Sequence, residues 1–99
     1  MLIRIVRMTF KEDGVADFLT NFNLNKKAIR NTPGCKHLEL WQDENDKNIF
    51  HTYSHWENEE ALNQYRDSEL FKSVWSFTKP LFAAKPMAFS SKKIEEVKS

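Results

Sequence analysis

Two hydroxyl side chains and a tryptophan alternate along one predicted strand, directly before a predicted helix. The last part of this strand runs from His51 to Trp56, and its period of two places Thr52, Ser54 and Trp56 on one face. Hydroxyls beside an aromatic ring can hydrogen-bond an oxygen of a bound organic molecule while the ring packs against its apolar part. We therefore predict that this strand end borders a ligand pocket. A large ring that only closes a small core would produce the same pattern.

The opposite face of this predicted hairpin carries three imidazoles and a carboxylate. Predicted strands 35–42 and 48–56 flank a polar loop centred near Asn45, and this centre fixes which side chains are neighbours. The expected cross-strand pairs are Glu39 with His51, His37 with Tyr53 and Cys35 with His55, and Trp41 and Ile49 share their face.

Two chemical roles can be considered for this histidine-rich face. A pair of Glu39 and His51 could serve as a general base, provided that a cavity reaches it. His51 and His55 lie about 13 Å apart along a strand, too far to share an ion that binds at about 2 Å. We therefore predict no metal site and expect a polar network inside a dimer. The lone Cys35 has no basic cluster beside it, which favours a small interior residue over a nucleophile.

Length and composition restrict the class of protein. The chain has 99 residues and a net charge of +1, with 15 Lys and Arg interspersed among 14 Asp and Glu. This fits one domain, residues 1–92, with a charged C-terminal tail, residues 93–99. The charge is too balanced to indicate nucleic acid or an anionic membrane as partner. A single cysteine and no signal-peptide pattern favour a cytoplasmic location.

The elements that must position these side chains follow from apolar periodicity and capping residues. The chain order β-α-β-β-α-β predicts an α+β fold of ferredoxin-like type with an antiparallel sheet. We expect strands at 2–10, 35–42, 48–56 and 87–91, a helix from about 13 to 31, a helix capped by Asn58, and a further helical segment at 69–78. Arg4 and Arg7 lie on opposite faces of the first strand, where each could hold an acidic substrate or be solvated.

A second subunit is expected on the sheet face that the helices leave bare. The face with Leu38, Leu40 and Phe50 is the more uniformly apolar and should contact the helices. The histidine-rich face is then too apolar for water and too polar for an ordinary core. Pairing of this face across a two-fold axis would cover it, so we predict a homodimer.

Several short motifs resemble those of the antibiotic biosynthesis monooxygenase family, in the order in which that family has them. They are Pro33-Gly34-Cys35, Glu39-Leu40, the acidic loop before Asn48-Ile49-Phe50, Trp56-Glu57-Asn58-Glu59-Glu60-Ala61-Leu62 and Ser68-Glu69-Leu70-Phe71. The resemblance covers most of the chain. It implies a dimeric α+β barrel in which each subunit keeps a pocket between its own sheet and helices.

The resemblance also implies a reaction. Members of this family include oxygenases that oxidise quinols or aromatic polyketides without metal or flavin, the substrate itself supplying electrons to oxygen. It implies no cofactor, a small aromatic substrate and a catalytic role for Trp56, with Thr52 and Ser54 on the same face as candidate catalytic groups. His51, from the pair with Glu39, is the candidate base. The expected substrate-binding walls are Val6, Met8, Phe22, Leu38, Phe50, Leu62, Phe71 and Trp75.

The chain departs from the family at informative positions. Polyketide oxygenases of this type have an Asn four residues before the tryptophan and a Tyr six residues after it, where this chain has Thr52 and Leu62. Haem-degrading relatives use a histidine ligand at a position similar to Trp75, which has no imidazole. Two other functions therefore stay open: a non-catalytic dimeric small-molecule binding or stress-response module, and an isomerase or lyase with His51 or His55 as base.

Overall fold

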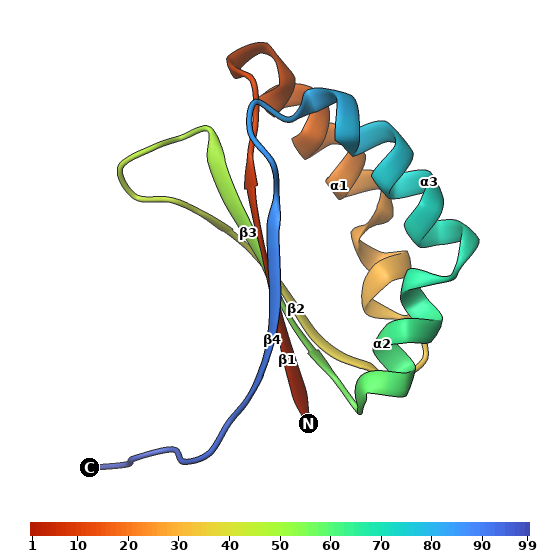
Figure 1. The fold of residues 1–99 in the computed structure, drawn as a ribbon, viewed down its shortest axis with the longest axis vertical. Coiled ribbons are helices and arrows are strands. Elements are labelled where there is room, and N and C mark those ends of the chain that lie inside the picture. The colour runs from red at the N-terminus through yellow and green to blue at the C-terminus, as the bar shows by residue number, and fades with distance from the viewer.

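The protein is an antiparallel sheet with all of its helices on one side. The computed structural model describes residues 1–99. The elements are β1 (Leu2–Thr9), η1 (Glu12–Gly14), α1 (Val15–Arg30), β2 (Cys35–Gln42), β3 (Ile49–Trp56), α2 (Glu59–Arg66), α3 (Glu69–Thr78), η2 (Lys79–Leu81) and β4 (Met87–Lys92). The strand order is β2-β3-β1-β4, and every neighbouring pair is antiparallel. The predicted ferredoxin-like α+β fold is confirmed, and Figure 1 shows the two layers.

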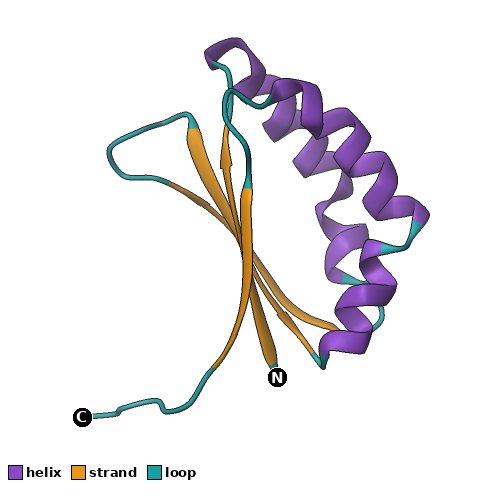
Figure 2. Cartoon of the chain, viewed as in Figure 1, coloured by secondary structure: helices purple, strands orange, loops and turns teal.

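The helices cover one face of the sheet and leave the other bare. In Figure 2 the α1, α2 and α3 ribbons all lie to the right of the strands, and the C-terminal segment leads away from both layers. Residues 93–99 have no regular secondary structure. No helix is long and apolar enough to cross a bilayer.

The helix boundaries follow the capping residues. The Asn58 side chain accepts a hydrogen bond from the Ala61 backbone N–H at 2.9 Å, which starts α2 as predicted. The Ser68 hydroxyl does the same for Phe71 at 3.2 Å and separates α2 from α3. Pro80, which has no N–H to donate, lies just beyond the end of α3. These caps fix where α2 and α3 begin above the sheet.

The interior consists of two small clusters rather than one continuous core. Only 12 of the 99 residues are buried. One cluster contains Met8, Phe10, Phe18 and Phe50, and the other contains Cys35, Trp56, Ala61 and Leu62. The two clusters leave the middle of the sheet-helix interface incompletely filled, and the cavity described below lies there.

The register of the β2–β3 hairpin differs from the prediction by two residues. Trp41 lies opposite His51, Glu39 opposite Tyr53, and His37 opposite His55. The turn is shifted because the Asp43 carboxylate accepts backbone hydrogen bonds from residues 45 and 46, at 3.0 and 2.9 Å. The expected pairing of Glu39 with His51 was therefore wrong, although both side chains lie on the predicted face.

A β-bulge places Cys35 in the interior. The pairing shifts between Cys35 and His37, so Cys35 lies opposite Trp56 instead of His55. The extra residue rotates the thiol away from the histidine-rich face, and Cys35 is 5% exposed. Burial raises the pKa of this thiol, which agrees with the prediction of an interior residue rather than a nucleophile.

Gly34 allows the chain to enter β2 directly beneath α2. Its φ of 86° is left-handed, and an added Cβ would overlap the Cβ of Ala61.

We expect Gly34→Ala to lower the free energy of unfolding by about 2 kcal/mol, through backbone strain and overpacking. Chemical denaturation measures this. Gly14→Ala is the matched control, since Gly14 has a negative φ and its added Cβ would be 3.2 Å from Leu81. Equal free energies of unfolding of the two variants would contradict the role that we assign to Gly34 in this turn.

Candidate functional site

A cavity of about 520 Å³ lies between the sheet and the helices. Its lining contains 22 residues, of which 13 are hydrophobic, and they come from all four strands or their flanks and from α1, α2 and α3. Ligand pockets for small organic molecules have volumes of roughly 300–1,000 Å³ and mostly apolar walls. The cavity therefore has the size and surface of a site for a small aromatic molecule.

The structure brings most of the predicted site residues to this cavity. The lining includes Thr52, Ser54, Trp56, Val6, Met8, Phe22, Leu38, Leu62, Phe71 and Trp75. Two predicted residues are elsewhere. Phe50 is 3% exposed and packs in the core, with its ring centroid 5.4 Å from that of Phe18. His51 points to the bare face of the sheet, because it is adjacent to Thr52 in the strand and successive side chains point to opposite faces.

Trp56 is part of the cavity lining but exposes almost none of its surface. Its side chain is 1% exposed, and the Tyr65 ring covers it in a stacked arrangement with centroids 4.9 Å apart. The indole N–H donates to the Ser54 hydroxyl at 2.9 Å. That hydroxyl has a longer contact, 3.5 Å, with the Arg4 carbonyl. Trp56 and Ser54 therefore hold each other in place and have little capacity left to bind a ligand.

Tyr65 supplies the polar group that Trp56 and Ser54 do not. Its phenol oxygen has no hydrogen-bond partner in the chain. Every fully buried polar side-chain atom has such a partner, so the Tyr65 oxygen is accessible from the cavity or from solvent. Burial raises the pKa of Tyr65 to about 12, which keeps the phenol protonated at neutral pH. Tyr65 can therefore donate a hydrogen bond to an oxygen of a ligand.

Helix periodicity is the signal in the sequence that indicates Tyr65. Leu62, an expected wall residue, lines the cavity, and Tyr65 is three residues further along α2. Residues three apart lie on the same face of a helix. A tyrosine thus enters the same cavity from the next turn. Thr52 provides a second hydroxyl in the lining, and it too has no partner within the chain.

The charged groups at the cavity are all positive. Arg4, Arg66, Lys72 and Lys79 belong to the lining, which contains no carboxylate and no imidazole. Burial lowers the pKa of Arg4, and the nearby Arg66 guanidinium lowers it further. The cavity therefore has hydrogen-bond donors and positive charge, but no side chain with the usual pKa of a general base.

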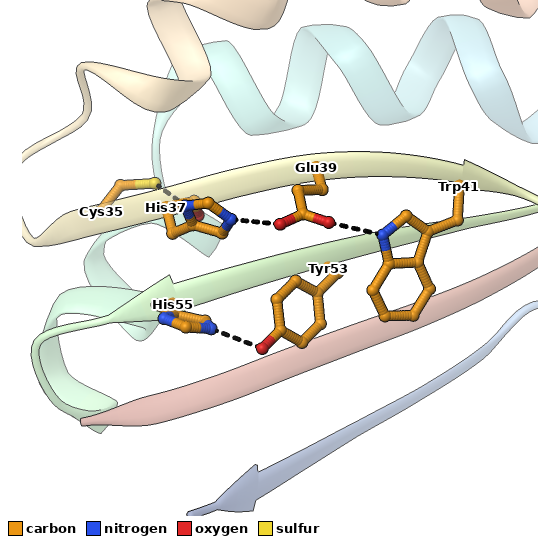
Figure 3. A network of polar contacts seen from close by, with 6 residues as sticks. All are labelled: Cys35, His37, Glu39, Trp41, Tyr53 and His55. Atoms are coloured by element: carbon orange, nitrogen blue, oxygen red, sulfur yellow. Dashed lines mark hydrogen bonds and ion pairs between the residues drawn. The ribbon is translucent and has the colours of Figure 1, made fainter. Parts of the chain in front are cut away.

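The bare face of the sheet carries a separate polar network, which Figure 3 shows from close by. The Glu39 carboxylate is bonded to the His37 ring and accepts from the Trp41 indole N–H at 2.8 Å. These hydrogen bonds hold the pKa of Glu39 below its usual range. His55 contacts the Tyr53 hydroxyl at 2.8 Å, and burial followed by the charges of His37 and Lys93 lowers the pKa of His55. No three His, Cys, Asp or Glu side chains converge as metal ligands would.

Comparison with known proteins gives one family. The family model described as antibiotic biosynthesis monooxygenase matches residues 1–74, from β1 into α3. No curated protein matches the sequence significantly.

Solved structures agree in fold at low sequence identity. A crystal structure named antibiotic biosynthesis monooxygenase has a TM-score of 0.90 at 18% identity, covering 96% of this chain and 100% of its own. A protein from Nitrosomonas europaea, which bears the same name provisionally, has a TM-score of 0.88 at 15% identity with the same coverages. A conserved protein from Methanosarcina mazei Go1 has a TM-score of 0.87 at 19% identity, covering 94% of this chain and 93% of its own. These likenesses concern the fold alone.

Proposed function

Since this chain belongs to the antibiotic biosynthesis monooxygenase family, we propose that it is a cofactor-independent monooxygenase of small aromatic substrates. The substrate, a quinol or a polyketide-like phenol, occupies the cavity between sheet and helices. The observation that carries the proposal is an apolar cavity of about 520 Å³ whose free polar groups are hydroxyls and cations. Such a lining suits a flat aromatic molecule with an oxygen at one edge.

The side chains of the cavity have distinct roles in this proposal. The phenol of Tyr65 and the hydroxyl of Thr52 hydrogen-bond substrate oxygens, because both are free of partners within the chain. Trp56 and Ser54 act as positioning residues that fix the Tyr65 ring. The basic side chains favour the ionised, electron-rich form of the substrate. The substrate proton passes to water, and the ionised substrate supplies the electrons: one atom of oxygen enters the ring, the other leaves as water, and the chain supplies no carboxylate or imidazole base in the cavity.

Oxygen uptake with a reduced naphthoquinone tests the proposal. We expect protein-dependent uptake above the spontaneous oxidation of the quinol. Ala88→Trp would place a large ring into the cavity from edge strand β4 and should abolish this uptake. Ala84→Trp is the matched control, since Ala84 is exposed and is not part of the lining. Equal uptake by the two variants would show that the reaction does not occur in the cavity.

A non-catalytic small-molecule binding module is the second candidate. It is favoured by the absence of a base among the lining residues and by the engagement of the Ser54 hydroxyl with Trp56. Ligand binding to the cavity without oxygen uptake or product formation would select this function. An isomerase or lyase would need His51 or His55, which lie on the bare face of the sheet. Failure of both histidine substitutions to affect proton exchange in a candidate substrate would exclude that chemistry.

The bare face supports a further part of the proposal, a homodimer. Large apolar side chains remain exposed there: Trp41 is 39% exposed, Met87 60% and Phe89 48%. The polar groups beside them are largely satisfied within the face, as in the bonds of Glu39 to His37 and Trp41. A surface of this kind can be buried against a second copy at little desolvation cost.

Acidification is expected to destabilise the protein through His55. Its pKa in the folded chain lies below its usual value, so the unfolded chain binds the proton more readily. The contribution of His55 to the free energy of unfolding should therefore be fully present above about pH 6.5 and decrease as the pH falls below that value. His37, Glu39, Lys93 and the N-terminus act on the same imidazole.

Denaturation at one protein concentration, between about pH 8 and about pH 5, measures this dependence. His55→Gln should have a shallower dependence, because glutamine cannot be protonated in this range. A parent protein that is more stable at the acidic end would contradict the prediction.

A further inference from the structure

Two arginines border the Tyr65 end of the cavity without acidic partners. Arg4 is in the middle of the inner face of β1, and Arg66 is the last residue of α2. They reach the cavity from opposite layers, one from the sheet and one from the helices. They are close enough for the charge of Arg66 to lower the pKa of Arg4. Two like charges thus line the same apolar pocket.

The chain does little to neutralise this pair. The ion pairs of the structure involve only His37, Lys93 and Lys98 with Glu39 and Glu96, so neither arginine takes part in one. Arg4 makes one side-chain hydrogen bond, from its guanidinium to the Ser90 hydroxyl at 3.1 Å, and that partner is neutral. A guanidinium that loses part of its hydration is stabilised by an anionic partner, and the partly buried Arg4 has none in the chain. The cavity therefore leaves free donors and positive charge for an anion from outside the chain.

We propose that Arg4 and Arg66 form an anion-binding subsite, and that the ligand of this cavity is an aromatic molecule bearing a carboxylate. The inference rests on the proposal that the cavity is the ligand site, and it adds the substrate class. The carboxylate binds between the two guanidinium groups, which match its geometry with paired donors. The aromatic body extends along the apolar walls, past Tyr65 towards Phe71 and Trp75.

Equilibrium binding tests the subsite independently of catalysis. The probes are 2-naphthoate and 2-naphthalenemethanol, which share a ring system and differ in charge. Isothermal titration of the full chain at about 0.1 M salt keeps charge effects measurable, since the Debye length is then about 10 Å. We expect the carboxylate to bind at least about tenfold more tightly than the alcohol, as befits hydrogen bonds to a charged group.

Three variants test which residues cause the preference for the carboxylate over the alcohol. Arg4→Gln and Arg66→Gln should each reduce it severalfold while leaving the affinity for the alcohol almost unchanged. Arg66 is exposed, so its substitution should not prevent folding even if that of Arg4 does. Arg7→Gln is the matched control, because Arg7 is on the same strand with its side chain on the opposite face, and it should keep the full preference.

The outcomes separate this inference from the proposed function. Equal affinities for the two probes would overturn the anion subsite and leave the cavity as a ligand site. A preference that survives in both arginine variants would also overturn it. Binding of neither probe would overturn the cavity as the ligand site, and the anion subsite with it. Oxygen uptake without carboxylate preference would support the oxygenase alone.

Discussion

Replacement of Trp56 by alanine is expected to lower the free energy of unfolding by about 3–5 kcal/mol. The indole is 1% exposed and, with Cys35, Ala61 and Leu62, makes up one of only two buried clusters. Its removal leaves a void beside the cavity and deprives the Tyr65 ring of its stacking partner. It also removes the donor to the Ser54 hydroxyl. In a domain of this size such a loss is a large part of the total stability.

Denaturation with urea measures the effect, and Trp56→Phe separates its causes. Phenylalanine keeps a ring beneath Tyr65 but cannot donate to Ser54, so its cost should be clearly smaller than that of alanine. Trp56→Ala that costs less than about 1 kcal/mol would show that the neighbouring side chains collapse into the space. It would also contradict our assignment of Trp56 as the residue that holds this end of the cavity.

Tyr65→Phe is expected to lower the turnover of an oxygenase substrate about a hundredfold with little change in stability. The phenol is the donor that we assign to the substrate oxygen, and loss of one such donor costs roughly 10²–10³ in rate. Its oxygen has no partner in the chain, so its removal breaks no internal hydrogen bond. If the bond is made only in the transition state, kcat and kcat/KM should fall equally.

The second tyrosine of the chain provides a matched control. Tyr53→Phe also removes one hydroxyl, but from the bare face of the sheet, where it contacts His55. Its rate of oxygen uptake should match that of the parent protein. An unchanged rate in Tyr65→Phe would reject the assigned role. A loss of rate in Tyr53→Phe alone would point to the bare face as the site of the chemistry.

Local rules in the sequence were sufficient for the secondary structure and the layers. The cap at Asn58, the break before Glu69 and the alternation in Thr52, Ser54 and Trp56 depend on interactions within a few residues. These interactions survive in almost any surrounding structure, so the predicted elements agree with the observed ones to within about two residues. The helix-covered sheet face also followed from its apolar composition.

Predictions that needed a second element were less secure. The pairing of Glu39 with His51 failed because the Asp43 turn shifts the hairpin by two residues. Cys35 turned inward through a bulge that no pattern in the sequence marks. Phe50 was expected at the pocket and instead packs against Phe18, because α1 covers that part of the sheet. The Asp43 turn is a local feature that apolar periodicity does not mark, whereas the positions of Cys35 and Phe50 depend on contacts with residues far away in the chain.

The sequence by itself determined the elements, their order, the family pattern and the face of every strand residue singled out except Cys35, because these follow from near-neighbour geometry. Only the tertiary structure decided which polar groups are free. Tyr65 of α2 stacks on Trp56 of β3, whose indole N–H already donates to the Ser54 hydroxyl, and the Tyr65 phenol is left open. The meeting of β1 with the end of α2 places Arg4 near Arg66. Hydrogen bonds and charges act over a few ångströms in space, and periodicity along a chain does not specify those distances.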